Sequence, residues 1–263
     1  MNISDKKIDG GKPFDWGRTS ADYARYRDIY PQEFYDKIIK RGLCTSGQRV
    51  LDLGTGTGVL PRNMYHYGAK WVGTDISEKQ IEQARWLSQG MDIDYRVASA
   101  EKLDFSPNSF DVVTACQCFW YFKPEILVPK LLKIMKKDGH LLILYMAWLP
   151  NEDKIAGESE RLILKYNPQW NGAGEWVHPI DIAPEYLKDF ELAYHEEYRL
   201  NVHFTRESWH GRVKACRGIG ASLTEKEIAK WEAEHKAMLQ KIAPDEFNVL
   251  HYAALAELKI KEN

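Results

Sequence analysis

The sequence predicts an α/β fold, a doubly wound and mostly parallel sheet covered by helices. Segments with the pattern of buried strands alternate with segments of helical periodicity, which is the order of βαβ units. The run Ser109–Trp120 is almost continuously apolar, as expected for a central parallel strand covered on both faces. With 263 residues, of which 44% are apolar, the chain has enough core for one domain with a lid.

The segment Val50–Gly58, with the sequence VLDLGTGTG, predicts a buried strand, a glycine turn and the start of a helix. Glycines let a backbone adopt positive φ and approach a ligand closely, and a helix N-terminus favours an anion or a polar group. Asp52 precedes the first glycine, Gly54, by two residues, so it would repel a pyrophosphate and attract an amino group. S-adenosylmethionine (SAM) has an amino acid end, a sulfonium and a ribose, but no phosphate. This turn therefore favours SAM over a dinucleotide.

A second strand is expected at Trp71–Asp75, and it ends in an acid. Asp75 lies 19 residues after Gly56, close to the spacing of about 20 residues for an acid that binds ribose hydroxyls. That spacing alone fits NAD equally well. Ile76 is expected to pack on an adenine face, and Ser77 is a candidate N-cap for a helix at 78–85.

The segment Tyr95–Phe105 follows these motifs. In this order, the motifs make residues 14–149 resemble the class I SAM-dependent methyltransferases. The resemblance is to the group that includes ubiquinone/menaquinone-biosynthesis and trans-aconitate methyltransferases. It implies a seven-stranded sheet with an antiparallel last strand and helical lid insertions. It also implies methyl transfer from SAM by in-line displacement, and a cofactor site formed by Asp52, Gly54, Gly56, Gly58, Asp75, Ile76, Ser99, Ala100, Glu101 and Gln117. Ser99 stands where the family usually has an acid; a serine hydroxyl still accepts a hydrogen bond, more weakly.

Residues for the acceptor are expected in three places. Related methyltransferases fold a segment like Tyr23–Arg27 over the cofactor, so Tyr23 and Arg27 would contact the amino acid end of the donor or an acidic substrate. The alternative is a surface helix whose long side chains lie along the protein. Trp120 and Tyr121, which follow the fourth strand, would line an apolar or cation-binding pocket, with simple packing as the alternative.

The third place is the long loop at 167–179, rich in Trp, Gly and Pro, which has the character of a functional lid. Trp176 would line the acceptor pocket. His178 is a weak candidate for a general base, which is needed only if the acceptor is a weak nucleophile such as a hydroxyl. A structural or solvent-exposed histidine is the alternative, so the catalytic residue stays unknown.

The expected organisation has four parts: N-terminal cap helices at 1–45, a SAM-binding core at 46–149, a lid insertion at 150–189, and C-terminal strands and helices at 190–263 that complete the sheet and the acceptor pocket.

Three local features are also expected. A helix should run from Pro124 to Lys137 and turn at Asp138–Gly139 into a fifth strand at 141–150. Two overlapping capping boxes, Ser222 with Glu225 and Thr224 with Glu227, precede a long helix. Phe247–Ile260 is expected to supply the last strand.

Composition narrows the function classes. A net charge of −2 with interleaved charges gives no nucleic-acid footprint. The polar residues 1–12 do not resemble a signal peptide, and the longest apolar run is too short to span a bilayer. We therefore expect a cytoplasmic monomer or homodimer that acts on a small molecule and binds neither nucleic acid nor membrane.

Four cysteines do not form a disulfide framework. Cys116 and Cys118 share one face of a strand, which favours packing; a thiol ligand is the minority interpretation. No metal site is expected.

A SAM-dependent methyltransferase that acts on a small, partly apolar molecule is the leading hypothesis. Three alternatives stay open: an NAD(P)-dependent oxidoreductase, a SAM-binding protein without catalysis, and a methyltransferase that modifies protein or RNA.

Overall fold

The structure, a computed structural model, describes residues 3–172 and 180–262. A seven-stranded sheet has the strand order β3-β2-β1-β4-β5-β7-β6. The pairs β1–β2, β1–β4, β2–β3 and β4–β5 are parallel, and β7 and β6 are antiparallel, so the predicted fold class is confirmed. The strands are β1 (Arg49–Leu53), β2 (Lys70–Asp75), β3 (Ile93–Val97), β4 (Phe110–Cys116), β5 (Met135–Trp148), β6 (Phe190–Thr205) and β7 (Glu246–Ile260).

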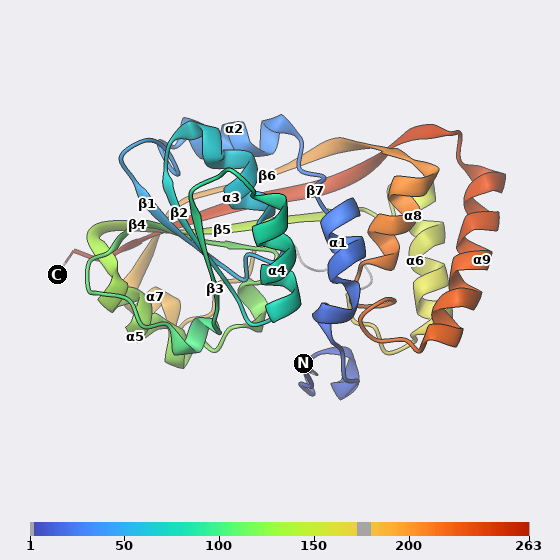
Figure 1. The fold of residues 1–263 in the computed structure, drawn as a ribbon, viewed down its shortest axis with the longest axis horizontal. Helices are drawn as coiled ribbons and strands as arrows, with labels where there is room; N and C mark the ends of the chain where they lie inside the picture. The colour runs from blue at the N-terminus through green and yellow to red at the C-terminus, as the bar shows by residue number, and fades with distance from the viewer. Residues whose placement is uncertain (1–2, 173–179, 263) are drawn as a thin grey trace. The chain divides into compact units, whose positions relative to one another are not determined.

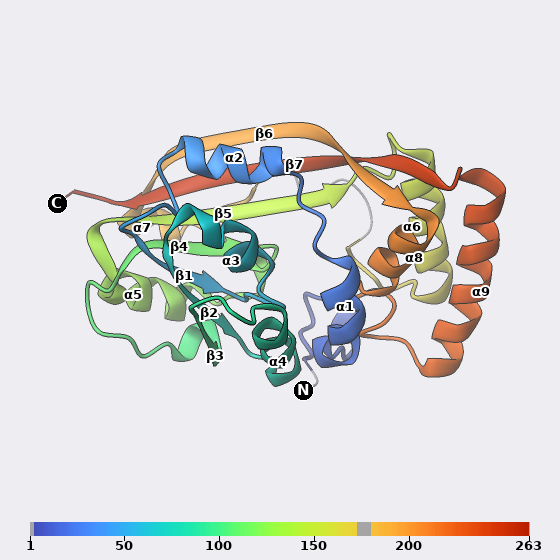
Figure 2. The ribbon, with the colours of Figure 1, turned by 45° about the horizontal axis from the view of Figure 1, so that its top comes forward.

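Helices connect these strands (Figures 1 and 2). The α-helices are α1 (Ser20–Tyr26), α2 (Gln32–Lys40), α3 (Val59–Met64), α4 (Glu78–Leu87), α5 (Pro124–Ile134), α6 (Lys154–Tyr166), α7 (Tyr186–Asp189), α8 (Arg206–Lys214) and α9 (Glu225–Ile242). Short 3₁₀ turns are η1 (Asp9–Gly11), η2 (Trp16–Thr19), η3 (Tyr65–Tyr67), η4 (Ala100–Lys102) and η5 (Phe119–Tyr121). No helix of the described residues is long and apolar enough to cross a membrane.

The chain divides into two compact units. The sheet unit comprises residues 30–146, 178–198 and 253–263, and the helical unit comprises residues 1–29, 147–177 and 199–252, within the described residues in each case.

The core of the sheet unit is formed by strands that are apolar on both faces. Val50, Leu51 and Val112 are completely buried, as are most of their neighbours on β1 and β4. In Figure 1, α2 and α3 gather on one side of the strands and α5 and α7 on the other. This is the layering of a doubly wound sheet, and it leaves the ends of the strands free to carry a site.

In the helical unit, α8 lies between α1 and α9, and α6 packs on α9 (Figure 1). Trp209 on α8 and Trp231 on α9 are completely buried. The Thr224 side chain caps α9 in a capping box with Glu227, so that prediction is confirmed. The overlapping box at Ser222 is wrong, because Thr224 takes the N-cap position and Ser222 Oγ donates to Arg217 O at 2.6 Å instead.

The end of α5 also differs from the prediction. The helix stops at Ile134 and β5 begins at Met135, so Asp138–Gly139 lies inside a strand rather than in a turn. Phe110 of β4 pairs with Met135, and the next pair is Val112 with His140, so extra residues of β5 are accommodated at an irregularity. An Asp-Gly pair suits a bulge as well as a turn, and the sequence alone does not separate them.

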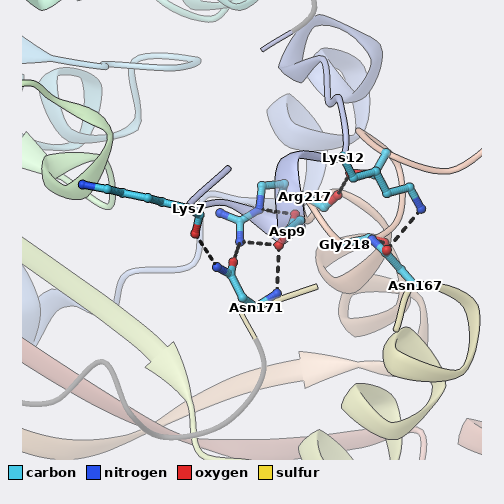
Figure 3. Close-up of polar contacts among 8 residues, drawn as sticks. Lys7, Asp9, Lys12, Asn167, Asn171, Arg217 and Gly218 are labelled. Atoms are coloured by element: carbon cyan, nitrogen blue, oxygen red, sulfur yellow. Dashed lines mark hydrogen bonds and ion pairs between the residues drawn. The ribbon is translucent and has the colours of Figure 1, made fainter. Parts of the chain in front are cut away.

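A polar cluster holds the N-terminal segment in the helical unit (Figure 3). Asp9 is completely buried, and its carboxylate accepts from Arg217 Nε at 2.8 Å and Arg217 Nη2 at 3.0 Å. The same carboxylate accepts from the backbone N–H of Asn171 at 2.8 Å, and Asn171 Nδ2 donates to Lys7 O at 2.8 Å. One buried carboxylate thus joins three segments that are far apart in the sequence.

Candidate functional site

Three polar residues of the sheet unit lie where parallel strands end. Asp52 is the fourth residue of β1, Asp75 is the last residue of β2, and Gln117 follows the last residue of β4. β1 pairs with both β2 and β4, so the three positions share one edge of the sheet. Ligands of open α/β sheets bind at this edge, beyond the carboxyl ends of the strands.

The turn between β1 and α3 accepts only glycine at two positions. Gly54 has φ +59°, and a Cβ on it would lie 2.8 Å from Cys118 Sγ. Gly58 has φ +73°, and a Cβ on it would overlap the Tyr95 hydroxyl. Left-handed backbone and close packing therefore both select glycine, and the turn exposes backbone rather than side chains to a ligand.

Asp52 is a buried carboxyl at the base of this turn. Its Oδ1 accepts a hydrogen bond of 2.6 Å from Thr114 Oγ1 on the neighbouring strand β4. Burial raises the pKa of Asp52 to about 6, and the hydrogen bond from Thr114 acts in the opposite direction. A cation that approaches this carboxyl would favour its ionised form, so the group suits an ammonium ligand.

Asp75 is held by two backbone groups. Its Oδ2 accepts from Gly56 N at 3.0 Å, and its Oδ1 accepts from Ser77 N at 2.8 Å. Burial raises the pKa of Asp75, and these hydrogen bonds lower it. Each oxygen keeps a second lone pair, so the carboxylate can accept from two further donors, as a ribose diol requires.

Ser77 stands at the N-cap of α4, as predicted, but its side chain makes no capping hydrogen bond. The backbone N–H of Ser77 donates to the Asp75 carboxylate. Next to it, the side chain of Ile76 is 38% exposed, which leaves an apolar surface beside the acid.

The predicted adenine-side residues lie in and next to η4. Ala100 is buried, and Ser99 precedes the turn without a capping hydrogen bond from its side chain. Glu101 Oε1 accepts from the backbone N–H of Lys123 at 3.2 Å. The carboxylate of Glu101 therefore joins η4 to the residue before α5.

Gln117 has a positive φ of +66°, which is unusual for a residue other than glycine. Its N–H donates to Leu144 O at 2.9 Å, and its Nε2 donates to Met146 O at 2.5 Å. Such strain persists only where the surroundings fix it, and it is concentrated at functional sites.

The predicted acceptor residues have different outcomes. Trp120 and Tyr121 in η5 are 39% and 36% exposed, and Trp120 packs edge-on against Tyr145 with ring centroids 4.9 Å apart. Both rings are thus on the surface of the sheet unit, next to the end of β4.

The remaining acceptor residues lie elsewhere. Arg27 lies over the Tyr23 ring, 4.6 Å from its centroid, and donates to Tyr23 Oη at 3.1 Å; both belong to the helical unit. Their contact with a donor or substrate stays a prediction. Trp176 and His178 lie outside the described residues, so their roles stay predictions too.

Three residues of this site were missed by sequence reasoning. Thr114 holds Asp52, Tyr95 fills the space beneath Gly58, and Cys118 fills the space beneath Gly54, where its Sγ donates to Leu53 O at 3.0 Å. Of these three residues, only Thr114 stands out in the sequence, as a polar residue within the apolar strand β4. The contact of Cys118 with the turn agrees with the interpretation of this cysteine as a packing residue. Among the described residues, no group of His, Cys, Asp and Glu side chains could hold a metal ion.

The fold and this strand edge define a class. A doubly wound sheet with a glycine turn after β1, and acids at the ends of β1 and β2, is a Rossmann-like fold that binds an adenosine-containing cofactor. The donor chemistry fits SAM: a buried carboxyl suits the ammonium, a second carboxylate has lone pairs for a ribose, and glycines admit close contact.

Comparison with known proteins identifies the family. Residues 51–143 match the methyltransferase domain family. The chain is 30% identical over 177 residues to a ubiquinone biosynthesis O-methyltransferase of Neisseria meningitidis, covering 64% of this chain and 73% of the relative. A protein of the same name from Dechloromonas aromatica is 30% identical over 173 residues, covering 64% and 74%.

Solved structures agree on the fold. The YcgJ protein from Bacillus subtilis has a TM-score of 0.52 at 19% identity, covering 88% of this chain and all of that one. A candidate type II methyltransferase from Anaeromyxobacter dehalogenans has a TM-score of 0.59 at 17% identity, covering 88% and 97%. The chain belongs to the class I SAM-dependent methyltransferases. It is a methyltransferase, and its cofactor is SAM rather than a nicotinamide dinucleotide.

Proposed function

We propose that this methyltransferase methylates a hydroxyl group of a small, partly apolar molecule. The observation that carries the proposal is the exposed ring of Trp120, which packs edge-on against the half-buried Tyr145 and follows the strained Gln117 at the end of β4. Rings on the surface beside the strand ends suit a flat apolar acceptor. The names of the O-methyltransferase relatives support a hydroxyl as the acceptor atom.

For SAM itself, we assign the ammonium to Asp52, with the Gly54–Gly58 turn around the methionine part. Asp75 accepts from the ribose hydroxyls. Ile76 and Ala100 lie beside the adenine, with Ser99 and Glu101 at its polar edge, and Gln117 lies near the methyl group. This assignment uses the lone pairs and exposed surface that the described residues offer.

The chain's contribution to catalysis is mainly orientation. Bound SAM supplies a methyl group that is already activated by its sulfonium. The turn and the two acids fix that donor, and the aromatic rings exclude water and hold the acceptor in line. A hydroxyl acceptor loses its proton in the reaction, and His178 is our candidate for the group that receives it.

The donor assignment is tested by ligand-dependent thermal unfolding. SAM or its demethylated product at about 100 times Kd adds about 2.7 kcal/mol, which raises Tm by roughly 5–10 °C. The double variant Asp52→Ala/Asp75→Ala should lose this shift. Asp94→Ala, which removes an exposed acid from β3, is the matched control and should keep it. An unchanged shift in the folded double variant would refute the assignment.

The acceptor assignment is tested with small phenols and catechols as probes and the demethylated product as readout. Trp120→Ala should raise the acceptor KM about tenfold, the loss of about 1.4 kcal/mol of contact, while SAM affinity stays the same. Trp86→Ala on α4, where the side chain is 64% exposed, is the control. Product formation only with a protein or an RNA would contradict the small-molecule acceptor.

A further inference from the structure

The helical unit contains a groove that the SAM site does not use. Its volume is about 430 Å³, within the range of small-molecule sites. The groove lies along α8, with α1 and α9 on its two sides. His210 and Gly211 of α8 line it, together with Tyr26 of α1 and Leu239 of α9. Tyr26 packs directly on Gly211, because a Cβ there would overlap the ring, so part of the lining is aromatic.

Most charges around this groove are paired. Lys214 lies 3.4 Å from Asp22 and 3.1 Å from Glu232, and so joins α1 to α9. Arg206 pairs with Asp245 at 2.8 Å, and Glu207 pairs with Arg25 at 2.7 Å.

Lys236 differs from these. It lines the groove one turn after Glu232, and its ammonium has no hydrogen bond or ion pair with any residue that the structure describes. Its ammonium is therefore available to a ligand of opposite charge.

A buried chain of hydrogen bonds ends at the same groove. Ser159 Oγ donates to Ile155 O at 2.8 Å, so toward His235 Nε2, at 2.9 Å, it is an acceptor. His235 Nε2 must then carry the proton, which makes His235 Nδ1 an acceptor. His210 Nδ1, at 2.8 Å from it, is consequently the donor.

Because the neutral His210 ring carries its proton on Nδ1, its Nε2 has no proton. That atom is buried, has no hydrogen-bond partner, and lies 3.5 Å from Glu232 Oε1, which is also an acceptor. His210 as a whole is 7% exposed. Two acceptors thus face each other at the wall of the groove, and a single added proton on Nε2 would satisfy both.

We propose that this groove binds a small organic monoanion of the carboxylate class at Lys236, and that His210 takes up a proton when the anion binds. The fixed charges that line the groove balance one another, with Arg206, Lys214 and Lys236 against Asp22, Glu207 and Glu232. Protonation of His210 leaves one net positive charge, which a carboxylate neutralises. The proton comes from solvent, and no bond of the ligand is broken.

The surroundings of His210 explain why the proton arrives only with the anion. Burial lowers the pKa of His210, the nearby Lys236 and Lys214 lower it further, and Glu232 raises it. An anion at Lys236 offsets the repulsion between that ammonium and the imidazolium. The charged and titratable groups that line the groove or contact the ring are Asp22 and Tyr26 on α1, Arg206, Glu207 and Lys214 on α8, and Glu232, His235 and Lys236 on α9.

The experiment uses benzoate as the anionic probe and benzamidine as a cation of the same shape. Binding to the full-length protein is followed through the imidazole ¹⁵N signals of histidine at about pH 6 and about pH 8, on either side of the ordinary histidine pKa. Benzoate should bind at least about threefold more tightly at the lower pH, and the His210 signals should move toward those of an imidazolium.

Lys236→Gln should weaken benzoate binding about fivefold, which corresponds to about 1 kcal/mol. Lys230→Gln, an exposed lysine of the same helix outside the groove, should leave it unchanged. The proposal is overturned if benzamidine binds in place of benzoate, if both variants have the same effect, or if affinity is equal at the two pH values. None of these readouts requires methyl transfer, so they stand apart from the test of the SAM site.

Discussion

At the residue scale, Asp52 links the chemistry of the site to pH. Its carboxyl is buried among apolar strands, and this burial raises its pKa to about 6. In the assignment that we propose, the ammonium of SAM needs the ionised form of Asp52, so below about pH 6 binding must first remove a proton.

We therefore expect SAM affinity to fall about tenfold per pH unit below about pH 6 and to be flat above about pH 7. Calorimetric titration of the protein with the demethylated product over this range measures the dependence. Asp52→Asn, which cannot titrate, should bind weakly at every pH. A wild-type affinity that does not change between about pH 5 and pH 7 would show that Asp52 does not contact the ammonium.

The Asp52 carboxyl also makes the stability of the folded protein depend on pH, in the opposite direction from most acidic side chains. Its pKa is raised from 3.8 in the folded state, so between about pH 4 and 6 the native protein holds more protons than the unfolded chain. Stability of the ligand-free protein is therefore lost as pH rises through this window. Asp52→Asn should stabilise the ligand-free protein at about pH 7 by about 1–3 kcal/mol, measured by urea denaturation. Destabilisation at that pH would mean that the carboxylate is better solvated than its burial indicates.

At the element scale, the turn after β1 depends on a ring from β3. The strand, turn and helix were all predictable from the spacing of apolar residues and glycines in residues 50–58. The contact between Gly58 and Tyr95 was not, because nothing local to either residue specifies which strand pairs with which. The same limit applies to β5, where only the pairing with β4 shows that Asp138–Gly139 belongs to a strand.

A comparison of two glycines with similar φ angles distinguishes the free-energy cost of a steric clash from the cost of a left-handed backbone. Gly58 and Gly90 have φ of +73° and +84°, but only at Gly58 does a Cβ meet another side chain. Gly90→Ala should cost about 1 kcal/mol for the left-handed backbone alone, and Gly58→Ala should cost at least about 2 kcal/mol more. Chemical denaturation measures both. Equal costs at the two positions would mean that the Tyr95 ring moves away without loss.

The N-terminal segment makes a second test of an element. Asp9 has a φ of +48°, a conformation that asparagine tolerates as well as aspartate does, so Asp9→Asn removes the charge and preserves the backbone preference. It removes the negative charge that accepts from the largely buried guanidinium of Arg217 (Figure 3), and breaking this buried ion pair should cost about 3 kcal/mol. Glu225→Gln, at an exposed ion pair with Arg18, should cost less than about 0.5 kcal/mol. Similar losses in both variants would contradict the assignment of Asp9 as a structural anchor.

At the scale of the whole molecule, the two compact units carry different titrating groups in their cores. The sheet unit contains Asp52 and Asp75, whose pKa values are raised by burial. The helical unit contains His235 and His251, for each of which burial lowers the pKa to about 3. This division was invisible in the sequence, since eight histidines are spread along the chain and none of them is marked as buried by its neighbours.

The units should therefore respond to acid in opposite ways. A buried histidine with a lowered pKa is neutral in the folded state and charged in the unfolded chain below about pH 6.5, so its contribution to stability is lost as pH falls. At about pH 5 each of the two histidines should cost the helical unit about 2 kcal/mol, while protonation of Asp52 should add about 1 kcal/mol to the sheet unit. Hydrogen exchange, corrected for intrinsic rates, reports the opening free energy of each segment separately. Between about pH 7 and pH 5 we expect amides of α8 and α9 to lose protection, and amides of β1 and β4 to keep or gain it. If all four elements lose the same amount of protection, the two units open together and the prediction is wrong.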